Sequence, residues 1–230
     1  MNVSTPQPLT IKVGSSTSVA ALLIHPSAAR ACIVLAHGAG AGMTHAFMEA
    51  TATGLAARGI ATLRYQFPYM EKGSKRPDPP AVAQAAVRAA VEAAARSCPG
   101  LPLVAGGKSF GGRMTSQAQA KAPLPGLRGL AFLGFPLHPA GKSSADRADH
   151  LADVQIPMLF LQGTHDKLAE MTLLRPVVAR LGARATLYPI EAADHSFHVP
   201  ARSGRNDREV MDEVLDTLAA WIDAVVSQHA

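Results

Sequence analysis

The stretch that most constrains the fold is residues 101–113, which read LPLVAGGKSFGGR. A short apolar run is followed by four glycines around Ser109 and then by a helical pattern at 114–121. Gly107, Ser109 and Gly111 match the G-x-S-x-G pattern of a nucleophile elbow, in which a strand turns sharply into a helix with the serine at its apex. Glycine is needed there because side chains two residues to either side would collide. The stretch therefore predicts a nucleophilic serine that faces the positive end of a helix.

Two other interpretations of this stretch remain open. Glycine and serine are common in loops, so the segment could be a turn that only connects a strand to a helix. It could also bind phosphate, but it lacks the spacing of a Walker loop. The apolar run before the glycines and the helix after them favour the nucleophile.

Short apolar runs and helical patterns alternate along the rest of the chain. Residues 14–16, Gly-Ser-Ser, separate the first two runs and predict an antiparallel hairpin. The alternation that follows predicts an α/β fold with a mostly parallel, doubly wound sheet, helices on both faces, and one domain over 1–230. The strand candidates are residues 9–13, 19–25, 31–36, 60–65, 101–105, 127–135, 157–162 and 185–190. The helix candidates are residues 44–58, 79–96, 114–121, 168–181 and 208–226.

Four residues that can carry chemistry each come just after a strand candidate. They are His37, Ser109, Asp166 and His195. The carboxyl ends of parallel strands meet at one edge of a sheet, where sites form. We therefore expect these residues to share that edge, although they lie far apart in the sequence.

A serine hydroxyl needs an adjacent base to act as a nucleophile at neutral pH. Among the nine histidines, His195 is the candidate because it follows the last strand candidate; the alternative is a histidine of a surface loop. Asp166 is expected to hold the imidazole tautomer and to stabilise the imidazolium. Asp194 is the rival acid, but its position next to His195 makes a bond to Nδ1 awkward, so we expect a loop or capping role for it.

An acyl-transfer site also needs two fixed donors for the oxyanion. The N–H of Phe110, directly after the serine, is the first candidate, and Ala39 or Gly40 supplies the second. Phe67 and Tyr69 are expected to close a small substrate pocket with aromatic surface, unless they pack inward. Residues 136–156 are polar and contain one short helix candidate at 144–153. The sequence thus predicts no lid and a preference for short acyl groups.

Composition excludes several other classes of protein. The chain has 230 residues, of which 48% are hydrophobic, and no apolar run long enough to span a membrane. The net charge of +5 comes from scattered basic residues without a nucleic-acid-binding motif, so we expect no nucleic-acid partner. Two cysteines, Cys32 and Cys98, and no visible secretion signal predict a cytoplasmic protein with free thiols. No metal-ligand spacing or dinucleotide-binding motif is present, so no metal or cofactor is expected.

The motifs HGAGAG, GGKSFGGRM, QGTHD and ADHSF together resemble the α/β-hydrolase family. They are most similar to the small lidless group related to dienelactone hydrolases, and also resemble a hydrolase-like chromatin-complex subunit of eukaryotes. The resemblance implies an α/β-hydrolase fold without a large cap domain and a Ser109, Asp166, His195 triad. Dienelactone hydrolases carry a cysteine nucleophile, so Ser109 argues against their specificity here.

These observations predict a serine hydrolase that cleaves a small carboxylic ester or thioester through an acyl-enzyme. The alternative is a hydrolase-fold interaction scaffold without turnover. The sequence leaves the physiological substrate and the oligomeric state open.

Overall fold

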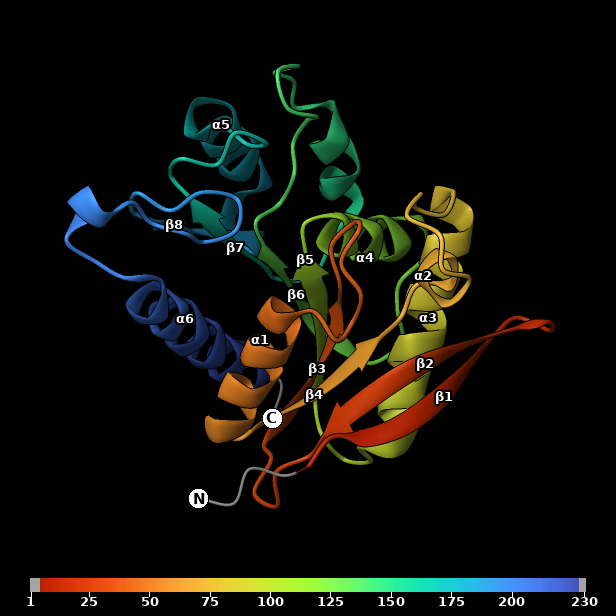
Figure 1. Ribbon diagram of the computed structural model, residues 1–230. Helices are drawn as coiled ribbons and strands as arrows, with labels where there is room; N and C mark the ends of the chain where they lie inside the picture. The colour runs from red at the N-terminus through yellow and green to blue at the C-terminus, as the bar shows by residue number, and fades with distance from the viewer. Residues whose placement is uncertain (1–4, 228–230) are drawn as a thin grey trace.

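The computed structural model describes residues 5–227 and is built on a single eight-stranded sheet (Figure 1). The strand order is β1-β2-β4-β3-β5-β6-β7-β8. The first two strands form an antiparallel hairpin that pairs antiparallel with β4, and all later neighbours are parallel. This confirms the predicted doubly wound, mostly parallel sheet with an N-terminal hairpin. The strands are Gln7–Val13 (β1), Thr17–Ile24 (β2), Ala31–Ala36 (β3), Ile60–Tyr65 (β4), Leu103–Lys108 (β5), Leu127–Leu133 (β6), Met158–Gly163 (β7) and Ala185–Ile190 (β8).

Helices cover both faces of the sheet. In Figure 1, α1 and α6 lie on one side of the strands, and α3 and α4 lie on the other. The α-helices are Ala46–Ala57 (α1), Pro68–Glu71 (α2), Pro80–Ser97 (α3), Phe110–Lys121 (α4), Met171–Leu181 (α5) and Asp207–Ser227 (α6). The 3-10 helices are Asp146–Asp153 (η1), Gly182–Arg184 (η2) and Ala201–Ser203 (η3).

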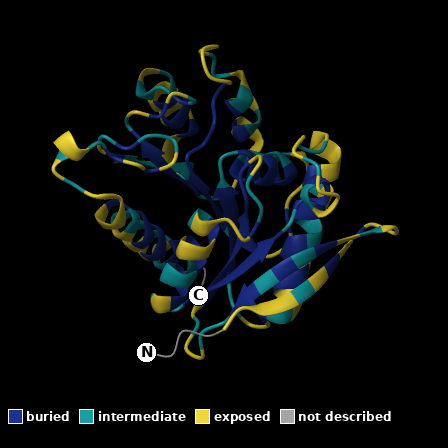
Figure 2. Cartoon of the chain, in the orientation of Figure 1, coloured by how far each residue is buried: buried dark blue, intermediate teal, exposed yellow. Residues whose placement is uncertain are grey.

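The central strands are apolar throughout because both of their faces are covered. In β3, for example, Ile33 and Leu35 pack with α1 and α6, whereas Cys32 and Val34 pack with α3 and α4. Successive side chains of a strand point to opposite faces, so one run of apolar residues serves two cores. Figure 2 shows this as buried central strands with exposed residues on the outer faces of the helices.

Several predicted elements have different bounds in the structure. The strand expected at 101–105 continues through both glycines to Lys108, and the following helix begins at Phe110, not at 114. Glycine is required inside β5 because a Cβ on Gly106 would lie 1.8 Å from the carbonyl oxygen of Ala131 on β6. Only Ser109 separates the strand from the helix, so the turn is sharper than the sequence indicated.

The segment between β6 and β7 contains no cap domain within the described chain. Its only helical element is η1, where the sequence predicted a short helix at 144–153. The short helix α2, which follows β4, was not predicted.

Candidate active site

Ser109 lies at the turn between β5 and α4 in a strained backbone conformation, with φ 51° and ψ −114°. A positive φ is uncommon for a residue with a Cβ and is typical of functional turns. The flanking glycines allow the strand and helix to approach β3. A Cβ on Gly107 would lie 2.2 Å from the carbonyl oxygen of Ala36, and one on Gly111 would lie 2.6 Å from the same atom. The predicted steric reason for the G-x-S-x-G pattern is therefore present in the structure.

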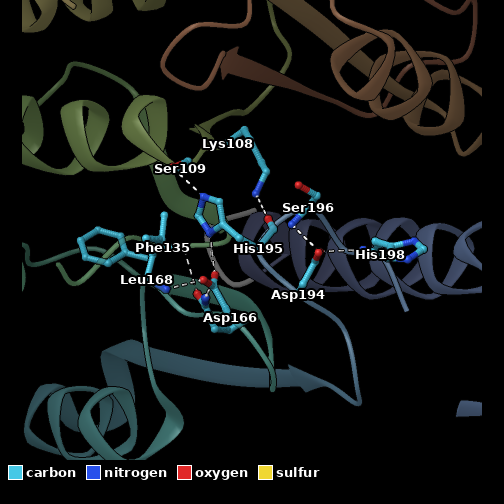
Figure 3. A network of polar contacts seen from close by, with 10 residues as sticks. Lys108, Ser109, Phe135, Asp166, Leu168, Asp194, His195, Ser196 and His198 are labelled. Atoms are coloured by element: carbon cyan, nitrogen blue, oxygen red, sulfur yellow. Dashed lines mark hydrogen bonds and ion pairs between the residues drawn. The ribbon is translucent and has the colours of Figure 1, made fainter. Parts of the chain in front are cut away.

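The loops after β7 and β8 bring Asp166 and His195 to the same sheet edge as Ser109 (Figure 3). His195 Nε2 lies 2.8 Å from Ser109 Oγ, and His195 Nδ1 lies 2.6 Å from Asp166 Oδ2. The imidazole side chain is 25% exposed, whereas the Asp166 side chain is fully buried. A serine hydroxyl is activated by a base within hydrogen-bond reach, and the base in turn is held by a buried carboxylate. The three side chains have this arrangement.

Asp166 is held by two further donors. The Leu168 N–H donates to Oδ1 over 2.8 Å, and Gln162 Nε2 donates to Oδ2 over 2.5 Å. The amide of Gln162 is itself oriented, because its Oε1 accepts a hydrogen bond from the Phe135 N–H at 2.8 Å. Sequence reasoning missed Gln162. Its only signal was a buried polar residue at the end of the apolar strand β7, close before an aspartate.

Asp194 has a different role from Asp166, as the sequence interpretation expected. Its Oδ1 accepts hydrogen bonds from the N–H groups of Ser196, at 2.7 Å, and His198, at 3.0 Å. These bonds close the turn that carries His195 (Figure 3). Asp194 therefore shapes the loop, and its Oδ1 is occupied by backbone donors.

The loop after β3 carries the candidates for the second oxyanion donor. The Gly40 N–H donates to the hydroxyl oxygen of Tyr69 at 3.3 Å, so this group already has a partner. Ala39 is exposed and lines the same cavity as Ser109. Phe110 is the first residue of α4, where backbone N–H groups have no partner inside the helix. The N–H groups of Ala39 and Phe110 therefore remain the candidates for the two oxyanion donors.

His37 holds this loop in place. Its Nδ1 donates to the Gly38 carbonyl over 2.8 Å, and its Nε2 accepts from the Phe67 N–H over 3.1 Å, which together define one neutral tautomer. Burial lowers the pKa of His37, which keeps the ring neutral. The side chain is therefore structural.

Lys108, next to Ser109, is a site residue that sequence reasoning did not identify. Its ammonium group donates to the carbonyl of His195 and lies 5.5 Å and 5.1 Å from the ring centroids of Phe47 and Phe197. These two rings stack on each other. Burial lowers the pKa of Lys108 to about 8. The lysine thus connects β5, α1 and the histidine loop through one buried charge.

A cavity of about 480 Å³ opens at Ser109. Its apolar lining includes Phe47, Met48 and Leu168, and its polar lining includes Lys108 and His45. The lining residues are Gly38, Ala39, Ala41, His45, Phe47, Met48, Lys108, Ser109, Leu168, His195 and Ser196.

The predicted aromatic wall of Phe67 and Tyr69 does not line this cavity. Phe67 is fully buried and Tyr69 is 2% exposed. Both rings pack against Phe110 and His37, beneath the loop after β3. The short helix α2 turns the chain inward directly after β4, so the alternative of inward packing is the one observed.

Two further observations concern metal binding and the membrane. Across residues 5–227, no cluster of three or more His, Cys, Asp or Glu side chains is arranged to hold a metal ion. In the same part of the chain, none of the helices combines the length and apolar character needed to cross a bilayer.

Several solved structures share this fold along nearly their whole length. A dienelactone hydrolase from Anabaena variabilis is 19% identical, with 96% of this chain and 98% of that chain covered and a TM-score of 0.77. XC6422 from Xanthomonas campestris, a serine hydrolase without a lid, is 20% identical over 94% of each chain, with a TM-score of 0.72. An α/β serine hydrolase homologue from Coxiella burnetii is 16% identical over 96% of this chain and 99% of that chain, with a TM-score of 0.74.

A family model for the alpha/beta hydrolase domain matches residues 29–223, which span the sheet from just before β3 and most of α6. The similarity to a chromatin-complex subunit stays a prediction from the sequence. The chain belongs to the alpha/beta hydrolase domain family, and it is a small member without a lid.

Proposed function

We propose that this protein is a serine hydrolase that cleaves a small carboxylic ester or thioester through an acyl-enzyme intermediate. The observation that carries the proposal is the pair of contacts on His195: 2.8 Å from Nε2 to Ser109 Oγ and 2.6 Å from Nδ1 to Asp166. One imidazole can thus take a proton from the serine while its other nitrogen is held by a carboxylate.

The reaction follows from these positions. Ser109 Oγ forms a bond to the carbonyl carbon as His195 Nε2 takes the hydroxyl proton. The bond to the leaving oxygen or sulfur then breaks, and His195 gives its proton to the departing alcohol or thiol. A water molecule repeats the two steps, which releases the carboxylic acid and restores the serine. Asp166 keeps Nδ1 protonated and stabilises the imidazolium that forms.

The negative charge on the carbonyl oxygen needs fixed donors during both steps. The N–H groups of Phe110 and Ala39 are our candidates, because Phe110 begins α4 and the Gly40 N–H is bonded to Tyr69. The N-terminal end of α4 adds its partial positive charge at the same position. Removing one such donor typically lowers kcat by roughly 10²–10³-fold.

The cavity supports a small substrate. Its volume of about 480 Å³ is at the lower end of small-molecule sites, which span roughly 300–1,000 Å³. Phe47, Met48 and Leu168 can cover a short acyl or alcohol group. The segment between β6 and β7 contributes no lid that could enclose a long chain.

Labelling with a fluorophosphonate probe tests the proposal directly, because the probe reacts preferentially with an activated serine. The wild-type protein is expected to be labelled and to hydrolyse short p-nitrophenyl esters and acyl thioesters. Ser109→Ala is expected to lose labelling and to lower kcat by about 10⁴-fold or more. Ser16→Ala, in the exposed turn of the β1–β2 hairpin, is the matched control and should behave as wild type.

Two outcomes would contradict the assignment. A folded Ser109→Ala variant with normal turnover would remove Ser109 from the mechanism. A wild-type protein that neither reacts with the probe nor cleaves esters, thioesters or lactones would favour the interaction-scaffold alternative.

A further inference from the structure

Arg113 lies four residues after Ser109, in the first turn of α4. Its backbone N–H donates to the Ser109 carbonyl over 3.1 Å. The guanidinium carbon lies 6.0 Å from the ring centroid of Phe110, the residue that follows the serine. Side chains of a helix lean toward its N-terminus. The Arg113 guanidinium therefore lies beside Phe110, one helical turn from Ser109, and is not among the residues that line the cavity at Ser109.

The guanidinium group of Arg113 has no polar partner among residues 5–227. Its Nε is buried without a hydrogen bond, and no described carboxylate forms an ion pair with it. A guanidinium carries five N–H donors and stays charged in proteins. Burial lowers the pKa of Arg113, which reflects the free-energy penalty of this half-buried charge.

Two other half-buried arginines of this chain have carboxylate partners. Arg58 pairs with Asp216 over 2.7 Å and donates to the Gly54 carbonyl over 3.0 Å. Arg205 pairs with Glu213. These examples show how packed carboxylate and carbonyl groups satisfy a guanidinium, and Arg113 has neither kind of partner among the described residues.

A second arginine increases the positive charge at this place. Arg147 is half-buried in η1, which packs against α4, and its charge further lowers the pKa of Arg113. Within the described chain, the Arg147 guanidinium also has no hydrogen bond or ion pair. Two like charges at close range destabilise each other unless an anion lies between them.

The neighbouring groups do not supply that anion. His150 of η1 lies close by, but burial and the charge of Arg113 lower its pKa to about 4, so it is neutral at pH 7. Its Nε2 is bonded to Ser116 Oγ at 2.7 Å. The charges of Asp149 and Asp153, in the same 3-10 helix, raise the pKa of His150 but do not offset its burial. Neither carboxylate forms an ion pair with Arg113.

We propose that Arg113 and Arg147 bind an anionic group, a carboxylate or a phosphate, of the substrate that is cleaved at Ser109. This inference rests on the proposed hydrolase function and adds a substrate class to it. The planar guanidinium fork matches the two oxygens of a carboxylate or phosphate. Four residues of helix span about 6 Å along the axis, so the backbone of Arg113 lies one turn from that of Ser109. Short half-esters of dicarboxylic acids carry a carboxylate a few atoms from the scissile ester and are the simplest substrates of this class.

The kinetic test compares anionic esters with neutral esters of the same size. One series has the charge on the acyl side: the monoethyl esters of succinic, glutaric and adipic acid, each against the ethyl ester of the neutral acid of equal chain length. A second series has the charge on the alcohol side: acetate esters of short ω-hydroxy acids, against the matching alkyl acetates. Released acid is followed by titration, and the measured quantity is the ratio of kcat/KM for each pair.

The wild-type ratio should favour the anionic ester in at least one of the two series. Arg113→Gln and Arg147→Gln should each lower that ratio by about 10- to 100-fold, the range of a charge-assisted hydrogen bond. Arg175→Gln, which changes an exposed arginine of α5, is the matched control and should leave the ratio unchanged.

A binding measurement separates this proposal from the proposed function. Inorganic phosphate and glutarate should raise the melting temperature of the wild-type protein and have a smaller effect on Arg113→Gln. This result does not depend on turnover, so it can hold even if no ester is cleaved. Equal kcat/KM ratios for wild type and both arginine variants, together with equal melting shifts, would overturn the anion site while leaving labelling of Ser109 as a separate result.

Discussion

The buried charge of Lys108 should make the free energy of unfolding depend on pH. The ammonium group lies beside the candidate serine, and burial lowers its pKa from the ordinary value of 10.5 to about 8. The charges of Asp166 and Asp194 act in the opposite direction but do not offset the burial. The protein therefore holds a charge that its unfolded chain would solvate better.

The size of this effect follows from the shift in pKa. Each unit corresponds to about 1.4 kcal/mol, so the lowered pKa of Lys108 corresponds to about 3 kcal/mol at most. Below pH 8 both the folded and the unfolded state carry the proton, and the full penalty applies. Between pH 8 and 10.5 the unfolded chain binds more protons than the folded one, so this lysine makes the free energy of unfolding rise with pH.

Lys108→Met removes the charge and keeps an unbranched side chain. At pH 7 the variant should gain stability from the absent penalty and lose the two cation–π contacts, which contribute roughly 0.5–2 kcal/mol each. The difference between wild type and variant isolates the titration of Lys108, because all other groups cancel. We expect this difference to change in favour of wild type by about 2–3 kcal/mol between pH 7 and pH 10.

Urea unfolding at pH 7, 8, 9 and 10 measures this difference. Lys167→Met, which changes an exposed lysine, is the control and should follow the wild-type pH dependence. A difference between Lys108→Met and wild type that stays constant from pH 7 to pH 10 would refute the buried-charge argument. It would mean that the ammonium is solvated in the folded protein.

Three further predictions concern the proposed site and the elbow. Asp166→Asn should lower kcat by about 10⁴-fold by favouring the wrong imidazole tautomer, whereas Asp194→Asn should mainly lower stability. Steady-state kinetics and urea unfolding measure the two effects, and a larger loss of kcat in Asp194→Asn would contradict this assignment. Gly111→Ala should unfold the protein or lower its melting temperature strongly, because the new Cβ would lie 2.6 Å from the Ala36 oxygen, while Gly38→Ala, whose Cβ meets atoms no closer than 3.5 Å, should have little effect. Across p-nitrophenyl esters of increasing length, kcat/KM should reach its maximum at short acyl chains, and a steady rise to long chains would contradict the small cavity.

Much of the fold was predictable because its signals are local. The strands 31–36, 60–65 and 185–190 were predicted with the bounds that the structure shows. A strand covered on both faces must be apolar along its length, and that pattern is visible without any tertiary contact. The elbow was predictable for the same kind of reason, because its glycines are required by a backbone clash close to the serine.

The order of the candidate triad was also readable from the sequence. Ser109, Asp166 and His195 each follow a strand candidate, and parallel strands bring their carboxyl ends to one edge. The structure brings the three side chains within hydrogen-bond distance of one another, in the order Ser109, His195, Asp166.

Other contacts were decided only by the tertiary structure, because they depend on elements that are distant in the sequence. Phe67 and Tyr69 pack inward because α2 turns the chain after β4, so Phe47 of α1 forms the aromatic part of the cavity instead. The environment of Lys108 also depends on α1 and on the loop after β8, which no local pattern connects.

The unpaired guanidinium of Arg113 shows the same distinction. The sequence placed an arginine one helical turn after the serine, as it placed others along the chain. Whether an arginine finds a carboxylate depends on which helices pack together. The 3-10 helix η1 places a second arginine, Arg147, against α4. By contrast, α6 places the carboxylate of Asp216 next to Arg58. The periodicity of strands and helices and the need for glycine at the elbow depend on residues that are neighbours in the sequence. The pairing of charges depends on which elements pack together in the folded chain.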